Sequence, residues 1–364
     1  MARPVPESER PDMLNLGICG WSGCTAPADT STMTMQVDWI RAYDMTPPPS
    51  PPPSPPTAPH PTGPQLCWIE EFSPCTTSNC YNGLDTNRWG FETGDGSQYG
   101  LTQWGTTENT CYSNTTKEVR AENINDGGVS RSVLTINAWN SKTMFSCGNF
   151  RTTTRSARMI SRNKAAFRYL DNTTLLLIEA RMRVPLTASA WPAFWMLPGM
   201  PRTNCVGCSA YGDGWCNGGE VDIMEAKNGD GIVNQTLHFG GGSGANFYVG
   251  CTYTTRELRS AYSSAGTAAG MSSWFTAQLE WGGSYFKFMI DGVIVSSLVQ
   301  SPPPAAPTWY TGAVSTSSNP LAPFDKPFYL IANLAVCGNF VGKPCTPADS
   351  TFQIDWIKVW DLYP

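Results

Sequence analysis

Short runs of alternating or continuous apolar residues recur along the chain from about residue 67 to the C-terminus. Clusters of Gly, Asn, Ser and Pro separate these runs, and this combination is typical of β-strands joined by turns. No long stretch has the 3.6-residue period of an amphipathic helix, although residues 254–270 leave room for a short one. The clearest predicted strands are residues 132–140, 174–184, 275–281, 285–290, 327–334 and 351–360.

These strands predict an all-β fold for most of the chain. A sheet must bury one apolar face, and many short strands do this best as two packed antiparallel sheets. We therefore expect a two-sheet antiparallel β-sandwich of the jelly-roll type. A chain of 364 residues allows one large domain of this kind together with connectors.

A proline-rich segment divides the chain. Eleven of the eighteen residues at 47–64 are proline. Proline fixes φ and removes a backbone donor, so this segment is predicted to form polyproline II. We interpret residues 47–66 as a semi-rigid linker, and a ligand for an SH3-type domain is the alternative.

The segment before the linker repeats the end of the chain. Residues 15–44 and 333–361 share two cysteines followed by an Asp-Trp pair, at a spacing close to a whole domain. We predict that residues 1–46 are the truncated tail of an upstream copy of the domain that residues 67–364 form completely. The matching positions are Cys19 with Cys337, Cys24 with Cys345, Asp38 with Asp355, and Trp39 with Trp356.

The amino-acid composition limits the binding partners that are expected and indicates the compartment in which the protein folds. Only 15% of the residues are charged and the net charge is −5, so neither nucleic acid nor an anionic membrane is expected to bind. Thirteen cysteines favour an oxidising compartment, and N-x-[ST] sequons at Asn114, Asn172 and Asn234 agree with a secreted glycoprotein. No apolar stretch is long enough to span a membrane. We expect a secreted or cell-wall protein, and the N-terminus has no signal sequence, which suggests a fragment of a longer chain.

The candidate chemistry lies at residues 218–225, which read G-G-E-V-D-I-M-E. Side chains alternate along a strand, so Glu220 and Asp222 are expected on one face. Val221 and Ile223 then point into the apolar core.

Strict alternation would bury Glu225 in that core, where an unpaired carboxylate is costly. A β-bulge at residues 223–224 would absorb one residue and return Glu225 to the face of Glu220 and Asp222. Such a row suits glycoside hydrolysis, which needs one carboxylate nucleophile and one carboxylic acid. One pKa of the row should rise, because like charges at close range do not all ionise easily. A solvated strand face is the alternative.

Several motifs in order resemble glycoside hydrolase family sixteen, and specifically its laminarinase-like branch with the bulged E-x-D-x-x-E motif. The resemblance covers nearly all of residues 67–364 and implies a concanavalin-like jelly roll. Besides the acidic strand, the matching segments are W-P-A-F-W-M-L at 191–197, S-A-R at 156–158, E-A-R at 179–181, T-L-H at 236–238, I-D-G at 290–292, N-L-A-V at 333–336 and I-D-W-I-K-V-W at 354–360.

The resemblance also implies roles for individual residues. Glu220 would be the nucleophile, Glu225 the general acid/base, and Asp222 the residue that tunes the nucleophile. The residues implied to bind substrate are Trp191, Trp195, Arg158, His238, Glu108 and Asn339. Core packing is the alternative for the two tryptophans, a purely structural ion pair for the arginine, and a structural role for the histidine.

Two segments depart from the family pattern. W-G-T-T-E at 104–108 has Thr where the family has Asn, and C-G-N-F at 337–340 has Cys and Phe where Gly and Trp are usual. Both resemble edges of the sugar subsites, so they put the exact glucan preference in doubt.

Two groups of residues have side chains that could bind a metal ion. Cys205, Cys208 and Cys216 have spacing compatible with zinc, but disulfides fit an oxidising compartment better. Glu71 and Asp355 resemble positions near a structural calcium of the family, with oxygen ligands that would suit this ion. No cofactor is expected for catalysis, and structural calcium stays open.

The predicted function is retaining endo-hydrolysis of β-1,3-glucan or mixed β-1,3/1,4-glucan through a glycosyl-enzyme. The alternatives are a wall-polysaccharide transglycosylase and a non-catalytic, lectin-like carbohydrate-binding domain. Galactans such as agar or carrageenan remain possible substrates. We expect the domain to be a monomer within a longer tandem-domain chain and its partner to be a polysaccharide.

Overall fold

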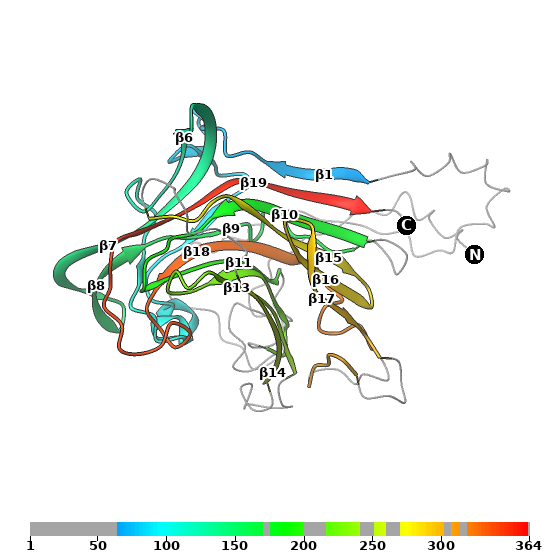
Figure 1. Ribbon diagram of the computed structural model, residues 1–364. Coiled ribbons are helices and arrows are strands. Elements are labelled where there is room, and N and C mark those ends of the chain that lie inside the picture. Colours follow the sequence, from blue (N-terminus) through cyan, green and yellow to red (C-terminus); the bar gives the residue numbers. More distant parts are fainter. Residues whose placement is uncertain are drawn as a thin grey trace, which may run out of the picture. The chain divides into compact units, whose positions relative to one another are not determined.

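Two sheets stack face to face in the computed structural model (Figure 1). The structure describes residues 64–169, 175–199, 216–240, 251–259 (backbone only), 270–301, 307–312 and 319–362. These residues belong to one unit, which spans Pro61–Pro364. The predicted upstream tail and nearly all of the predicted linker lie outside the described residues.

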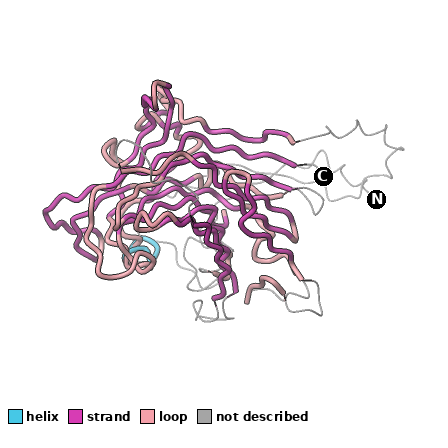
Figure 2. The backbone as a smooth tube through the Cα atoms, viewed as in Figure 1, coloured by secondary structure: helices cyan, strands magenta, loops and turns pink. Residues whose placement is uncertain are grey.

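The larger sheet has ten strands and the smaller has seven. The ten-stranded sheet runs β17-β16-β15-β10-β19-β7-β8-β5, with β1 paired to β19 and β6 paired to β7. The seven-stranded sheet runs β14-β13-β12-β11-β18-β9-β4. All their pairings are antiparallel except that of β5 with β8. The predicted all-β sandwich is therefore confirmed, and Figure 2 shows how little of the backbone is helical.

The strands and short helices have the following bounds: β1 Gln65–Glu70, β2 Cys80–Tyr81, β3 Leu84–Asp85, β4 Gly90–Glu92, η2 Ser97–Tyr99, η3 Gln103–Gly105, β5 Cys111–Tyr112, β6 Val119–Asp126, β7 Val129–Cys147, β8 Phe150–Ser156, β9 Arg158–Ile160, β10 Leu175–Arg183, β11 Ala190–Pro198, β12 Glu220–Ala226, β13 Ile232–Gly240, β14 Cys251–Arg259, β15 Phe275–Gly282, β16 Tyr285–Ile290, β17 Val293–Val299, β18 Phe328–Val336 and β19 Ser350–Leu362. All six predicted strands are present. The short helix predicted at residues 254–270 is wrong for its first six residues, which belong to β14, and its remainder lies largely outside the described part of the chain.

The core fills the space between the two sheets. From the larger sheet, β10 contributes Ile178 and Met182, while from the smaller sheet β11 contributes Phe194 and Met196. Their neighbours along each strand face outward, as period-2 alternation requires. The two inner faces thus share one apolar cluster, and its burial is the main driving force for folding.

A second, smaller apolar cluster lies on the outer face of the seven-stranded sheet. The segment with η2 and η3 contributes Trp104, and β5 contributes Tyr112. These rings pack against Ile331 of β18 and Leu197 of β11. The segment therefore covers part of this face, beside the strand that carries the acids.

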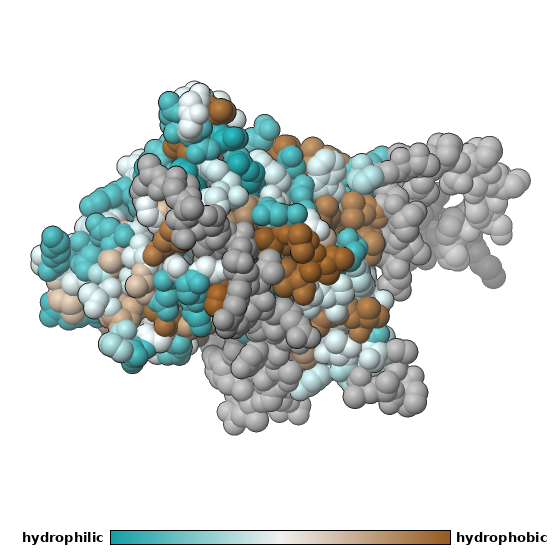
Figure 3. Space-filling model, viewed as in Figure 1, coloured by the Kyte–Doolittle hydropathy of each residue, from teal (hydrophilic) through white to brown (hydrophobic). Residues whose placement is uncertain are grey.

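Some apolar side chains stay on the surface along β17, which forms one edge of the larger sheet. Val293, Ile294 and Val299 are each more than half exposed, at 62%, 58% and 60%. Figure 3 shows that one face of the molecule carries brown apolar patches among teal and white residues.

The turn between β12 and β13 needs glycine at two positions with positive φ, Gly229 (+58°) and Gly231 (+77°). A Cβ on Gly229 would lie 2.3 Å from the carbonyl carbon and oxygen of Leu186, whereas a Cβ on Gly231 would meet nothing within 4 Å. Left-handed backbone costs an alanine about 1–2 kcal/mol, and overpacking adds about 1–3 kcal/mol.

We therefore expect Gly229→Ala to lower the free energy of unfolding by about 1–3 kcal/mol more than Gly231→Ala does. Urea unfolding of the two variants measures this difference. Equal losses would show that the contact with Leu186 imposes no constraint on the turn.

Candidate active site

The acidic strand is β12, whose burial alternates as the sequence predicted. Val221 and Ile223 are fully buried in the core cluster. Glu220 is half-buried, and Asp222 is 2% exposed. Asp222 pairs directly with Trp195 of β11, which packs in the second apolar cluster on the outer face. The two acids therefore lie on the face opposite the core.

A β-bulge returns Glu225 to that same face. Asp222 lies opposite Thr236 of β13, and Glu225 lies opposite Asn234, so three steps on β12 match two on β13. The extra residue lies between Asp222 and Glu225, where the sequence predicts it, and the predicted bulge is confirmed.

Ile223 has no partner in the register of β12 with β11 or with β13, and a side chain contacts its backbone. Gln235, which is 1% exposed, donates its Nε2 to the carbonyl of Ile223 at 2.9 Å and to that of Met289 at 3.3 Å. Met289 belongs to β16 of the other sheet. Gln235 thus satisfies the bulge and ties it to the facing layer.

His238 lies beside two of the acids. Its Nε2 is 3.0 Å from Asp222 Oδ2 and 3.6 Å from Glu220 Oε1. Burial raises the pKa of Asp222 well above its ordinary value, because an ionised carboxylate loses its hydration there. Burial thus disfavours the ionised form of Asp222 beside Glu220.

Glu225 has a different environment from Glu220. Burial, followed by the nearby Asp222 carboxyl, raises the pKa of Glu225 to about 8. The Trp191 indole, whose Nε1 donates to Glu225 Oε1 at 2.9 Å, opposes this shift, as do His238 and Lys227. Glu225 therefore carries a proton at neutral pH, as a general acid must.

A row of polar side chains extends from Glu225 across the sheet. Glu225 lies opposite Ala193, which lies opposite Asn333. Asn333 lies opposite Arg158, which lies opposite Glu92 at the edge. Beyond Ala193 of β11, the three strands β18, β9 and β4 thus place polar groups along one line on the outer face.

The arginine of this row is held in place by its neighbours. Arg158 is 5% exposed, and its Nε lies 2.7 Å from Glu92 Oε2. Its guanidinium stacks between the rings of Trp104 (4.5 Å) and Trp195 (4.7 Å). Trp195 in turn donates its Nε1 to Asn333 Oδ1 at 2.7 Å. Burial favours the alternative of a structural ion pair for Arg158 over direct contact with a sugar.

The two remaining candidates for substrate binding differ sharply in exposure. Glu108 is 3% exposed, and burial raises its pKa to about 7, while Arg158 and a hydrogen bond with Tyr112 oppose the shift. Asn339 is exposed, and its Oδ1 accepts a 2.6 Å hydrogen bond from Thr107. The burial of Glu108 therefore favours a structural role, whereas the exposed Asn339 side chain can contact a ligand.

Sequence reasoning missed several residues around the acids. Asn333 belongs to the N-L-A-V motif, but its bond to Trp195 was not foreseen. Asn234 is 3% exposed and lies opposite Glu225, so its sequon is inaccessible in the folded protein. Lys227 and Gln235 carried no signal, because their roles depend on contacts that only the fold creates.

One group of described residues has the geometry of a metal site. Potential ligand atoms of Glu220, Asp222 and His238 lie within 4.8 Å of one another. This group consists of two acids of β12 and the neighbouring His238 of β13. Cys216 is disulfide-bonded, which agrees with the disulfide interpretation, while Cys205 and Cys208 lie outside the described residues.

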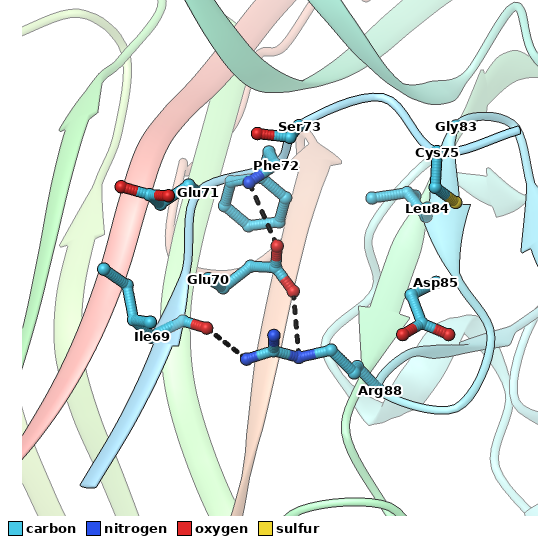
Figure 4. Close-up of a pocket in the computed structure, with 10 residues that line it drawn as sticks. All are labelled: Ile69, Glu70, Glu71, Phe72, Ser73, Cys75, Gly83, Leu84, Asp85 and Arg88. Carbon is cyan, nitrogen blue, oxygen red and sulfur yellow. Dashed lines mark hydrogen bonds and ion pairs between the residues drawn. The ribbon is translucent and has the colours of Figure 1, made fainter.

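The two residues expected near a calcium ion, Asp355 and Glu71, have different surroundings. The Asp355 carboxylate is paired with Arg181 and lies 3.6 Å from Arg131 Nη1, so its charge is already balanced. Glu71 is exposed and lines a pocket of about 300 Å³ between β1 and β3. In Figure 4 its carboxylate points away from Asp85 across that pocket, where Glu70 pairs with Arg88 at 3.3 Å.

Three disulfides join described cysteines: Cys75–Cys80, Cys111–Cys147 and Cys337–Cys345. Cys67 is the one free cysteine among the described residues, and it is exposed. Among the described residues, no helix has the length and apolarity needed to cross a membrane.

Comparisons with known proteins agree with this geometry. The chain is 32% identical over 308 residues to glucan endo-1,3-beta-glucosidase A1 of Niallia circulans, covering 82% of this chain and 38% of that protein. It is 31% identical over 233 residues to a beta-1,3-glucan-binding protein of Penaeus monodon, covering 56% of each. The chain therefore spans less than two thirds of the length of each of these two relatives. No protein-family model matches the chain.

The structure is similar to the laminarinase catalytic domain of Thermotoga maritima, with a TM-score of 0.58 and 26% identity over 82% of this chain and 98% of that one. Fold and relatives together indicate a β-sandwich glycoside hydrolase. The chain is a homologue of laminarinases and endo-1,3-β-glucanases, and the resemblance predicted from its motifs is confirmed at that level.

The bulge generates a stability prediction. Gln235→Met keeps the side-chain volume but removes the donor to Ile223, so a buried carbonyl loses its partner. We expect a loss of about 1–3 kcal/mol in the free energy of unfolding. Urea unfolding measures it, with the partly exposed Gln278→Met as control. A loss no larger than that of the control would rule out this role for Gln235.

The pKa of Glu225 generates a pH prediction. Because the pKa rises from 4.5 to about 8 on folding, its contribution to stability is fully present below about pH 4.5 and is lost as pH rises through about 8. Glu225→Gln mimics the protonated form. We expect its melting temperature, relative to the wild type, to rise between pH 5 and 9. Glu122→Gln on β6 serves as control, and parallel curves for Glu225→Gln and wild type would contradict the assignment.

Proposed function

We propose that this domain is a retaining endo-β-1,3-glucanase in which Glu220 is the nucleophile and Glu225 the general acid/base. One observation carries the proposal. Two carboxyl groups share one face of one strand but have different environments: Glu225 has a pKa of about 8, whereas Glu220 is half-buried beside His238. Divergent environments are what assign acid and nucleophile in carboxylate pairs.

In the first step, Glu225 donates its proton to the glycosidic oxygen while the Glu220 carboxylate attacks the anomeric carbon. The C–O bond breaks, the reducing-end fragment leaves, and a glycosyl-enzyme ester forms on Glu220. In the second step, the Glu225 carboxylate takes a proton from water, which attacks the anomeric carbon and releases Glu220. Both carboxyl groups return to their starting protonation states.

Asp222 and His238 support this chemistry. Burial disfavours the ionised form of Asp222, which limits the negative charge beside Glu220. His238 Nε2 lies 3.6 Å from Glu220 Oε1 and 3.0 Å from Asp222 Oδ2. This contact helps to orient both carboxyl groups. Trp191 and Trp195, which are half-buried on the same face, offer ring faces on which sugars can stack.

The substrate class follows from the relatives. The name of the Niallia circulans protein specifies glucan endo-1,3-beta-glucosidase, and we carry β-1,3-glucan over to this chain, with mixed-linkage glucan second. The oxidised cysteine pairs support a secreted protein. We propose that it acts on its polysaccharide as a monomer, within a longer tandem-domain chain.

A binding function is the second candidate, because the Penaeus monodon relative is named a beta-1,3-glucan-binding protein. The two candidates differ in turnover. We expect residues 65–364 to shorten laminarin and release new reducing ends, with retained configuration by NMR at the earliest times. Laminarin that is bound but not shortened would favour the binding protein. Longer products without new reducing ends would favour transglycosylation.

Variants of the two glutamates test their roles. We expect Glu220→Ala to stay folded and lose at least about 10³-fold in kcat, because no glycosyl-enzyme forms. Glu225→Ala should lose about 10²–10⁴-fold on laminarin but far less on an aryl glycoside whose leaving group needs no proton. Wild-type activity in Glu220→Ala would sink the mechanism, and equal losses of Glu225→Ala on both substrates would reassign the acid.

A further inference from the structure

The two segments that depart from the family pattern contact each other. Residues 103–110 include the second segment of short helix, η3, and residues 337–345 form a loop closed by the disulfide Cys337–Cys345. We call this loop the clasp. The hydrogen bonds that join the segment 103–110 to the clasp and to the end of β18 are Asn339 N to Thr106 O (2.8 Å), Thr107 Oγ1 to Asn339 Oδ1 (2.6 Å), Asn109 N to Val336 O (2.8 Å) and Val336 N to Thr110 Oγ1 (2.8 Å).

Gly338 lets the clasp approach a tryptophan of the site. Its φ is +103°, and a Cβ there would lie 3.2 Å from Trp191 Cζ3, Thr106 O and Glu108 Cα. Real Cβ contacts are rarely this short, and L-residues rarely adopt this φ. The backbone of the clasp is therefore fitted against the edge of the Trp191 ring.

Phe340 brings a second contact to Trp191. The two ring centroids are 5.2 Å apart with an interplanar angle of 47°. The Phe340 ring also contacts Lys227, whose Nζ lies 4.3 Å from the ring centroid. One aromatic side chain thus touches both the tryptophan and the lysine that act on Glu225.

The clasp is anchored on further sides. Cys337 N donates to Ser189 O at 2.8 Å, just before β11. Asn228 Nδ2 in the turn after β12 donates to Val341 O at 3.0 Å. The clasp therefore bridges the beginning of β11 and the end of β12, the two strands that supply Trp191 and Glu225.

We propose that the disulfide-closed clasp positions Trp191 and Lys227 against Glu225, with Phe340 as the positioning residue. This inference rests on the proposed function of Glu225 as general acid/base. It gives a purpose to both substitutions within the segment 337–340, because Cys337 closes the loop and Phe340 carries the contact.

The inference predicts a direction for the pH dependence. The groups that act on Glu225 are Asp222 on the same strand, His238 on β13, Lys227 in the turn and Trp191 on β11. Of these, Trp191 and Lys227 lower the pKa of Glu225 and contact Phe340. Release of both should raise that pKa further, so the alkaline limb of activity, which reports the protonated acid, should move to higher pH.

The experiment compares Phe340→Leu and Cys337→Ser/Cys345→Ser with wild type. We expect the alkaline limb of kcat/KM on laminarin to move up by about 0.5–1 pH unit, with kcat at pH 6 reduced about tenfold. Hydrolysis of an aryl glycoside with a good leaving group should change by less than about twofold in its first step. Phe340→Trp, which restores a ring, should keep the wild-type profile.

The matched control is Cys75→Ser/Cys80→Ser, which removes another short disulfide loop, closed over a sequence separation of 5 rather than 8. It should leave the pH limb in place. Folding of each variant is checked by its near-ultraviolet circular dichroism, and Phe340→Leu alone carries the test if the double cysteine variant does not fold. An unmoved limb in folded Phe340→Leu overturns the proposal.

A measurement without turnover separates this inference from the proposed function. Carboxyl ¹³C NMR follows the protonation of Glu225 directly in wild type and Phe340→Leu. A higher Glu225 pKa in Phe340→Leu than in wild type supports the proposed role of the clasp, even if wild type does not cleave laminarin. A wild type that does not cleave laminarin would contradict only the proposed glucanase activity. Identical titrations in the two proteins would overturn the clasp even if wild type is active.

Discussion

The site depends on one extra residue in a β-strand. Alternation along β12 would direct Glu225 toward Val221 and Ile223 in the core, where an ionised carboxylate is not tolerated. The bulge lets Ile223 and Met224 both pack inward, at 0% exposure, and turns Glu225 outward. The bulge leaves Ile223 outside the register with both neighbouring strands, and the buried Gln235 amide donates to its carbonyl. Core packing and the acidic row are therefore two results of the same irregularity.

On the outer face of the smaller sheet, ionisable side chains lie close together, and burial or ion pairing limits their charge. Burial raises the pKa of Asp222 well above its ordinary value and that of Glu225 to about 8, so the ionised forms of both carboxyl groups are disfavoured. Further along the row, the charge of Arg158 is balanced by Glu92 and its planar faces are covered by two indole rings. The same row thus changes from acid chemistry on β12 to a rigid ion pair at the sheet edge, because its members differ in partners and burial.

Much of this could be predicted from the sequence, since period-2 patterns report which face a residue occupies. The six predicted strands and the bulge follow from alternation and from the cost of a buried Glu225. Burial by distant segments could not be predicted in this way. Arg158 and Glu108 are covered by the segment around Trp104, and no local pattern reports such cover. Pairings such as that of Gln235 with Ile223 arise only when strands are in register, so residue type alone did not single them out.

The burial of Asn234 has a consequence for how the protein is made. This residue begins an Asn-Gln-Thr sequon within β13, yet it is 3% exposed and lies opposite Glu225. A glycan attached while the chain is still unfolded would have no space once β13 pairs with β12. In a secretory pathway, strand pairing and oligosaccharide transfer therefore compete for the same nascent segment. A host without N-glycosylation removes that competition, so the yield of folded domain depends on the compartment of synthesis as well as on the sequence.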